Sequence, residues 1–469
     1  MKSLTEELAD FVTKSRFERL PQPVVYETKR ILLDSIGCAL VGLATDKGKL
    51  SIELARRLGG PPESTIMGIG DKVSCASAGF ANGELINALD YDSLPHISPY
   101  VIPAPLALAE SIRAPGKALI LAIVLGYEIS ARMLKALTPP REYVNDGPEK
   151  GKIIWPWARG YASTIFGGTA AAGKTLGLQP ERMVHALGIA GYMCPVPAMA
   201  KWWESPPAAM AKYPSAGWLA QAEITSALLA QMGYTGDISV LDGEYGFWRF
   251  FSATKWEPKI LIENLGEEWH LLETAYKPYP CCRVMHSGLD CFKKIIDDNN
   301  LRAEDIETIN VLLDPMCDKA ICRNNQLKTH VDAQFSVAYV FSAMAHGIRI
   351  GADWQSLDSI RNPRILDFMK RVKFDPHSEY GKAALEDPYS RVSMVEVVAN
   401  GKTFKEETRY AKGTPFPEEA RMTDQELSNK FRENASRILP WEKIDKALQL
   451  ILDLEEMDEV SGLMEALTL

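Results

Sequence analysis

The sequence predicts a mainly α-helical protein that carries a second, α+β domain. Apolar residues at helical spacing dominate the chain up to about residue 260 and return after residue 420. Between these stretches, short runs rich in β-branched residues predict strands. The simplest architecture is a discontinuous all-helical domain with the α+β domain inserted into it. We expect the helical domain to comprise 1–268 and 410–469, and the α+β domain 269–409.

The helical pattern begins at the N-terminus. Ser3 and Glu6 have the spacing of a capping box, and apolar residues follow at helical intervals. Val24 to Leu43 predicts a second helix with a wide apolar face. The small-residue run from Gly167 to Gly173 predicts a helix whose backbone neighbouring helices approach closely. Further helices are expected over 77–89, 103–112, 117–137, 164–176, 181–192 and 217–232.

The middle of the chain mixes strand and helix patterns. Residues 306–313 form a β-branched run that predicts a strand, and 332–346 predicts a helix. Val392–Ala399 and Lys402–Arg409 flank the dipeptide Asn400-Gly401. Because Asn-Gly between two such runs is the strongest short hairpin signal, we expect a β-hairpin here.

Helical spacing returns near the C-terminus. Thr423 and Glu426 form a second capping box. Apolar residues at Ile444, Leu448 and Leu452 then predict the last helix of the chain. A cleft between the helical and the α+β domain is the natural place for a ligand.

Composition narrows the classes of function. The 469 residues are 46% hydrophobic and 24% charged, which is typical of a folded globular protein with a large core. The 52 Lys and Arg residues against 61 Asp and Glu give a net charge of −9. This balance argues against nucleic acid as a partner and against an acidic membrane surface. A local basic pocket for a small anion remains compatible with it.

The sequence also predicts the compartment. No stretch reaches the roughly 18 apolar residues of a transmembrane helix. The acidic N-terminus lacks the basic-then-apolar order of a signal peptide. Eight cysteines in this length do not make a disulfide scaffold. We therefore expect reduced thiols and a cytoplasmic protein.

One loop combines two carboxylates with an imidazole. Asp90, Asp92 and His96 follow directly after a predicted helix. This set suits acid/base chemistry or a hard metal ion, and a solvated turn with one hydrogen-bonded histidine is the alternative. The sequence lacks the motifs of nucleotide cofactors, phosphate-binding loops, serine hydrolases and zinc proteases.

Three further segments concentrate cations and aromatic rings. Arg159 and Tyr161 precede the small-residue helix, where a helix N-terminus attracts anions, although a packed aromatic loop is as good an interpretation. Lys212 precedes another predicted helix and could bind a carboxylate or act as a base, whereas taken alone it is a surface lysine. Lys277 to His286 supplies two cations and an imidazole, together with vicinal cysteines that we interpret as structural thiols.

These segments together resemble the MmgE/PrpD family, which includes 2-methylcitrate dehydratases, cis-aconitate decarboxylases and iminodisuccinate epimerases. The similarity runs over nearly the whole chain, and the motifs that carry it are Ile31–Leu40, Ala81–Asp92, Lys277–Arg283 with His286, and Met422–Arg432. It implies a helical domain built from both chain ends, an α+β lid and a homodimer. It also implies a lyase or isomerase that acts on a small organic acid with neither metal nor organic cofactor.

The resemblance also implies roles for single residues. His96 would be the general acid/base, and Lys212 and Lys277 would hold carboxylates or donate a proton. Asp90 would orient His96 or a substrate hydroxyl. Substrate-binding candidates are Ser93, Arg159, Arg283 and His286, the last two with a structural role in the lid as the alternative.

One departure from the family pattern concerns Tyr161, which stands near the usual position of a histidine. An ordinary tyrosine has a pKa of about 10, so it serves as a hydrogen-bond donor to an oxyanion rather than as a base at neutral pH. We therefore include Tyr161 among the catalytic candidates. Because the region is also rich in tryptophan, we expect a substrate that is bulkier or less charged than a tricarboxylate. The tryptophans are Trp155, Trp157, Trp202 and Trp203.

Two other functions stay open on the sequence alone. A metal-dependent hydrolase or lyase would use Asp90, Asp92 and His96 as ligands. A non-catalytic family member would serve as a scaffold or regulator. The joint presence of Asp90, His96 and the two lysines counts against a scaffold, and Tyr161 counts somewhat in its favour.

Overall fold

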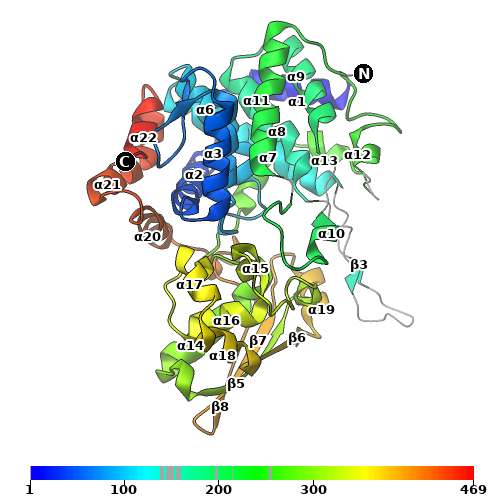
Figure 1. The fold of residues 1–469 in the computed structure, drawn as a ribbon. Coiled ribbons are helices and arrows are strands. Elements are labelled where there is room, and N and C mark those ends of the chain that lie inside the picture. The colour runs from blue at the N-terminus through cyan, green and yellow to red at the C-terminus, as the bar shows by residue number, and fades with distance from the viewer. Residues whose placement is uncertain are drawn as a thin grey trace.

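The computed structural model describes residues 2–137, 142–143, 153–154, 160–195, 199–213, 215–251, 253 and 256–469. A large helical body lies above a smaller body that contains the main sheet (Figure 1). The fold class predicted from the sequence, mainly helical with an α+β part, is confirmed. The boundaries at 268/269 and 409/410 stay a prediction. No helix in the described part of the chain has the length and apolarity needed to cross a membrane.

The helical body is built from both ends of the chain. Its N-terminal helices are α1 Leu4–Lys14, α2 Gln22–Gly42, α3 Asp46–Leu58, α4 Cys75–Ile86, α5 Ser98–Val101, α6 Pro103–Ser111, α7 Gly116–Leu137, α8 Ile165–Thr175, α9 Pro180–Met193, α10 Met199–Trp203, α11 Ala216–Met232, α12 Phe247–Phe250 and α13 Lys259–Ile262. Its C-terminal helices are α20 Asp424–Ala435, α21 Trp441–Leu452 and α22 Ser461–Ala466. α20 packs along α2, so the two ends of the chain share one core.

Local sequence signals explain several helix ends. The predicted capping boxes at Ser3 and Thr423 are present, each with a reciprocal hydrogen bond to the glutamate three residues on. The glycines of α8 allow the close approach that the small-residue run predicts. A Cβ atom on Gly167 would lie 2.1 Å from the carbonyl oxygen of Gly126 on α7. α7 and α8 therefore pack almost backbone to backbone.

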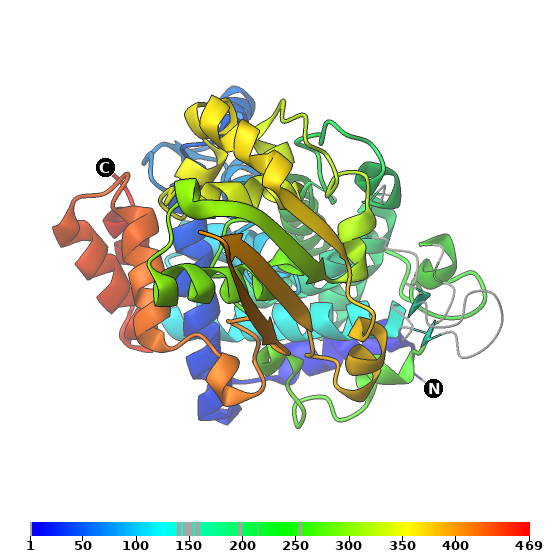
Figure 2. The ribbon, with the colours of Figure 1, turned by 90° about the horizontal axis from the view of Figure 1, so that it is seen from below.

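The smaller body holds a four-stranded sheet with helices packed on it. The strands are β5 Ile306–Leu313, β6 Val372–Pro376, β7 Ser393–Ala399 and β8 Lys402–Thr408, in the spatial order β6-β5-β7-β8. Figure 2, seen from below, shows these strands in front of the helical body. The helices of this part are α14 His286–Asn299, α15 His330–Phe335, α16 Val337–Ala345, α17 Leu357–Ile360, α18 Pro363–Phe368 and α19 Tyr380–Glu386.

The sheet is mixed. β5 runs antiparallel to β7, with Ile309 opposite Val397, and parallel to β6. The predicted hairpin joins β7 and β8, and both turn residues, Asn400 and Gly401, have positive φ angles. Positive φ at both central positions is what a tight two-residue hairpin requires, and Asn-Gly supplies it with little strain. Two small pairs of strands lie outside this sheet: β1 Ser64–Thr65 with β2 Lys72–Val73, and β3 Glu142–Tyr143 with β4 Ile153–Ile154.

Two clusters of buried apolar side chains form the core. One spans the helical body, from Leu8 to Tyr276 and from Met422 to Leu467. The other fills the smaller body from Tyr279 to Ala399 and also takes in Trp202 and Ala208. The segment from α10 to α11 therefore contacts both bodies, and it carries Lys212 to the seam between them.

Candidate active site

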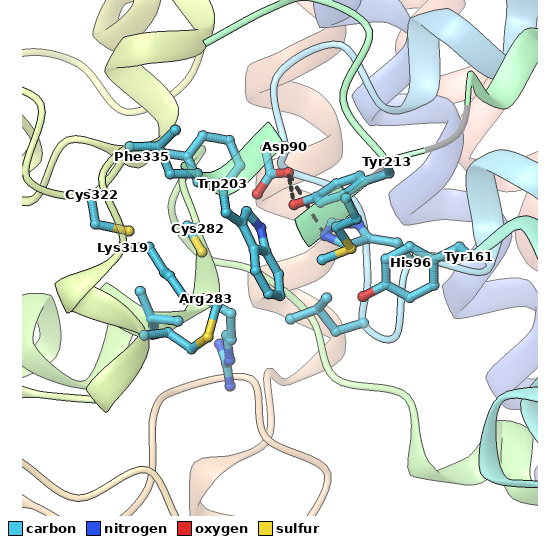
Figure 3. A pocket seen from close by; sticks show the side chains of 15 residues that line it. Asp90, His96, Tyr161, Trp203, Tyr213, Cys282, Arg283, Lys319, Cys322 and Phe335 are labelled. Atoms are coloured by element: carbon cyan, nitrogen blue, oxygen red, sulfur yellow. Dashed lines mark hydrogen bonds and ion pairs between the residues drawn. The ribbon is translucent and has the colours of Figure 1, made fainter. Parts of the chain in front are cut away.

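Asp90 lies at the centre of a polar cluster between the two bodies (Figure 3). It belongs to the loop that follows α4, and its side chain is fully buried. Its φ angle is +55°, a left-handed conformation that residues other than glycine seldom adopt. Such a backbone persists where the surrounding contacts hold it in place, and these sites are often functional.

Two lysines from distant parts of the chain bind this carboxylate. Lys212 Nζ donates to Asp90 Oδ1 at 2.7 Å. Lys277 Nζ donates to Asp90 Oδ2 at 2.5 Å and to the backbone carbonyl of Asp90 at 2.7 Å. Both lysine side chains are as buried as Asp90 itself. One loop carboxylate thus joins the segment before α11 to the segment after Thr274.

Burial and charge act in opposite directions in this cluster. Burial alone would raise the pKa of the Asp90 carboxyl, but Lys212 and Lys277 outweigh it and hold that pKa well below its usual range. Burial lowers the pKa of Lys212 to about 8, although Asp90 opposes the effect. Asp90 is therefore an anion at neutral pH, and Lys212 gives up its proton within reach of physiological pH.

His96 is held by the other carboxylate of the loop. Its Nδ1 lies 2.6 Å from Asp92 Oδ2, and Asp92 Oδ1 accepts from the side-chain amide of Asn87. Because an ionised carboxylate only accepts hydrogen bonds, Nδ1 carries the proton. Nε2 faces the lysine side of the cluster, 3.5 Å from Lys277 Nζ and 3.7 Å from Asp90 Oδ1.

Two tyrosines surround the imidazole. The ring of Tyr161 meets His96 edge-on at 5.4 Å between centroids, and the ring of Tyr213 lies 5.1 Å away. The hydroxyl of Tyr213 donates to Asp90 Oδ1 at 3.0 Å. Burial, followed by the nearby carboxylate of Asp90, raises the pKa of both phenols. Both therefore stay protonated at neutral pH, and Tyr213 acts as a hydrogen-bond donor.

The smaller body contributes two buried amides. Gln334 of α15 accepts from Lys212 Nζ at 2.7 Å and donates to the carbonyl of Ala88. It also donates to Gln355, which in turn donates to the carbonyls of Leu89 and Pro280. These bonds close the smaller body onto the loop that carries Asp90, which is the geometry of a lid over the site.

The other predicted site residues lie in different places. Arg283 borders the cavity beside the cluster, but its guanidinium donates to backbone carbonyls and to Thr414. His286 is fully buried against the carbonyl of Cys281, and burial holds its pKa well below the usual range, so it is neutral. Ser93 is buried against Ser98. Arg159, with Trp155 and Trp157, lies outside the described residues.

Sequence reasoning missed three contributors. Asp92 was counted with Asp90 and His96 as a set for acid/base chemistry or a metal ion, but it was given no role of its own, although its spacing of four residues from His96 was a usable signal. Tyr213 follows Lys212 directly, and that adjacency was the only sign of it. Gln334 had no sequence signal, because its role depends on how the lid docks.

The alternative metal site does not fit this arrangement. Among the described residues, no three His, Cys, Asp or Glu side chains form a group that could hold a metal ion. Each oxygen of Asp90 already accepts from a lysine ammonium group. A metal ion on Asp90 would have to displace both cations. The cluster instead combines an imidazole held by a carboxylate with two buried lysines.

The fold and the buried cluster are those of an enzyme with a helical body and an α+β lid. Comparison with known families agrees: the MmgE/PrpD N-terminal domain matches residues 6–259, and the MmgE/PrpD C-terminal domain matches residues 279–456. The chain belongs to the MmgE/PrpD family. It is a lyase or isomerase of the MmgE/PrpD type.

Curated relatives match over almost their whole length. Cis-aconitate decarboxylase of Homo sapiens is 26% identical over 483 residues, which covers 99% of this chain and 94% of the relative. Cis-aconitate decarboxylase of Aspergillus terreus is 23% identical over 496 residues, with 99% and 96% covered. The enzyme of Mus musculus is 24% identical over 487 residues, with 100% and 94% covered.

The lowered pKa of Lys212 predicts a specific pH dependence of stability. The pKa is about 8 in the folded protein, against 10.5 for an ordinary lysine. Between these values the unfolded chain binds more protons, so the contribution of this residue to the free energy of unfolding rises with pH. Lys212→Met should remove this rise in urea unfolding measured between about pH 7.5 and pH 10. The exposed Lys370→Met is the control, and equal slopes in both variants would contradict the assignment.

Proposed function

We propose that the protein transfers a proton at the carbon next to a carboxylate or carbonyl of a small organic acid. The observation that carries this proposal is the Asp92–His96 hydrogen bond of 2.6 Å. It fixes the imidazole with its proton on Nδ1 and leaves the lone pair of Nε2 directed at the site. A histidine held in this way is suited to general acid/base catalysis.

The surrounding charges suit the carbanion that such a reaction forms. Removing a proton beside a carboxylate places negative charge on the carbon and on the carboxylate oxygens. The ammonium groups of Lys212 and Lys277 lie next to His96 in a buried, preorganised cluster, where they stabilise such charge strongly. The protonated phenol of Tyr161 beside the imidazole supplies a hydrogen bond to the same oxygens, whereas that of Tyr213 already donates to Asp90.

Among the reactions that share this step, the relatives favour decarboxylation, because those named above are cis-aconitate decarboxylases. In that reaction the bond to the departing carboxyl group breaks, CO2 leaves, and its bonding electrons remain on the carbon. Protonated His96 would then give its Nε2 proton to this carbon. Dehydration and epimerisation need the reverse transfer first, from carbon to Nε2, and use the same groups.

We propose a cytoplasmic protein, in which the thiols stay reduced. All eight cysteines are free, and six of them are buried. Thiols in this state suit a reducing compartment.

The catalytic proposal is tested by proton NMR in D₂O with a panel of di- and tricarboxylates and of bulkier β-oxo and β-hydroxy acids. The wild type should exchange an α-proton or form new products. His96→Gln should lower the rate by about 10² to 10⁴, the usual contribution of an acid/base group. Asp92→Asn should give a loss of similar size, because Nδ1 loses the partner that fixes its proton.

His377→Gln is the matched control, because His377 lies in the lid between β6 and α19. Melting curves of all the variants separate loss of chemistry from loss of fold. An exchange rate that stays at the wild-type value in both His96→Gln and Asp92→Asn would refute the assignment.

We also propose a homodimer that uses the outer face of α3. Leu50, Leu54 and Leu58 follow one another at four-residue spacing and are 61%, 42% and 51% exposed. Trp218 on α11 is 46% exposed, and α3 and α11 both pack on α4 at the front of Figure 1. An apolar stripe of this kind on a folded protein marks an interaction surface.

Light scattering tests the dimer. The wild type should have twice the mass of one chain, and Leu54→Glu should shift it toward the monomer. Leu452→Glu on α21 is the control, because Leu452 has the same exposure of 42%. A monomeric wild type at micromolar concentration would contradict the proposal.

A further inference from the structure

A cavity of about 140 Å³ opens beside the acid/base cluster, between the helical body and the lid. Asp90, His96, Tyr161 and Tyr213 form one side of it (Figure 3). The lid and α10 form the opposite side. The cavity offers room for the remaining atoms of a substrate whose reacting carbon reaches His96 Nε2.

The wall that faces the cluster is mostly apolar. Trp203 stands in the middle of the lining side chains in Figure 3, with Phe335 close by. Its other apolar side chains are Met199, Val284, Met316 and Ile321, with the thiols of Cys282 and Cys322, and the cations Arg283 and Lys319 also border it. Burial raises the pKa of the Cys282 thiol to about 12, so it is neutral as well. Burying the apolar atoms of a ligand against this surface is favourable, whereas burying a carboxylate there costs free energy.

The cations near the cavity are mostly bound within the protein. Arg283 has five N–H groups, and four of its hydrogen bonds go to the carbonyls of Tyr276, Ala411 and Lys412 and to Thr414. Lys319 forms an ion pair with Glu204 at 2.8 Å. To bind a substrate carboxylate, Arg283 would have to break some of these hydrogen bonds, and Lys319 would have to break its ion pair with Glu204.

The two lysines of the cluster also use most of their N–H groups in hydrogen bonds within the protein. Lys212 donates two of its three N–H groups to Asp90 and Gln334. Lys277 donates to the side chain and the backbone of Asp90. The third N–H group of Lys277 faces His96 Nε2 at 3.5 Å, and Lys319 and Arg283 lie near the carboxylates of Glu204 and Asp290. Among the described contacts, Lys212 keeps one N–H group for a substrate, which suits one carboxylate and not three.

We propose that the substrate is an organic acid with a single carboxylate for the protein to hold and an apolar substituent, alkyl or aryl, that fills the cavity against Trp203. This proposal rests on the proposed function, because it places the reacting carbon at His96. It goes further by naming the substrate class, and it assigns Trp203 as a specificity-determining residue.

Binding measurements test the substrate class without turnover. The probes are straight-chain monocarboxylates from butanoate to octanoate, phenylacetate, succinate and citrate, with dissociation constants from ligand-observed NMR. Affinity should rise about fourfold for each added methylene until the cavity is full, as burial of a methylene group predicts. Succinate and citrate should bind more weakly than hexanoate. Hexanoate and phenylacetate compare the alkyl with the aryl substituent.

Variants of Trp203 test whether the cavity wall causes the dependence of affinity on chain length. Trp203→Ala should flatten the dependence on chain length, and Trp203→Phe should restore most of it. Trp441→Ala is the matched control, because Trp441 is 61% exposed on α21, and it should behave as the wild type. Melting curves of the variants confirm that each is folded.

Three results would overturn the proposal: affinity independent of chain length, citrate bound more tightly than hexanoate, or no monocarboxylate bound up to its solubility limit. Failure of the acid/base proposal gives a different pattern, since the binding series would hold while no member of the reaction panel exchanges a proton. The two proposals therefore fail separately.

Discussion

The buried carboxylate of Asp90 is the constraint on which the rest of the site depends. It accepts hydrogen bonds from Lys212 and Lys277, whose positions differ from its own by 122 and 187 residues. Two lysines with no carboxylate between them would be too costly to bury together. Asp90 thus lets the fold place two cations beside His96, where a developing negative charge needs them.

The lid completes this arrangement through amides and not through charges. Gln334 and Gln355 bind carbonyls of residues 88 and 89 in the loop that carries Asp90, and Gln334 also accepts from Lys212. Lid closure and the hydrogen bonding of Lys212 are therefore parts of one network. The helical body adds a second anchor from α20, because Lys430 donates to Asp34 and to the carbonyl of Tyr91. The loop between Asp90 and Asp92 is held from both bodies.

Local signals in the sequence predict much of the fold. The hairpin at Asn400-Gly401 and the strand over 306–313 are confirmed, since their turn chemistry and β-branched residues act over short distances. The predicted helix over 332–346 is broken at Ser336, whose extended backbone ends α15 and whose hydroxyl caps α16. β6 was missed because a five-residue strand that ends in proline has little pattern of its own. Its pairing with β5 is set by tertiary contacts.

The site is harder to predict, because its chemistry comes from long-range contacts. The loop Asp90–His96 stands out in the sequence, yet nothing local says that Asp92 and not Asp90 takes Nδ1 of His96. The family resemblance predicts that Lys212 and Lys277 belong to the site, but only the structure shows that both bind Asp90. The apolar wall around Trp203 is formed by segments far apart in the chain, so only the general richness in tryptophan hinted at it.

A double-mutant cycle on Asp90 and Lys212 tests this account most directly. Asp90→Asn leaves two buried ammonium groups without their carboxylate and should lower the free energy of unfolding by about 3–5 kcal/mol. Adding Lys212→Met should recover part of that loss, because one of the uncompensated charges is removed. Asp367→Asn, which breaks an exposed pair with Lys370, is the control and should change little. A small effect of Asp90→Asn, or strictly additive effects of the two substitutions, would contradict the central role of this carboxylate.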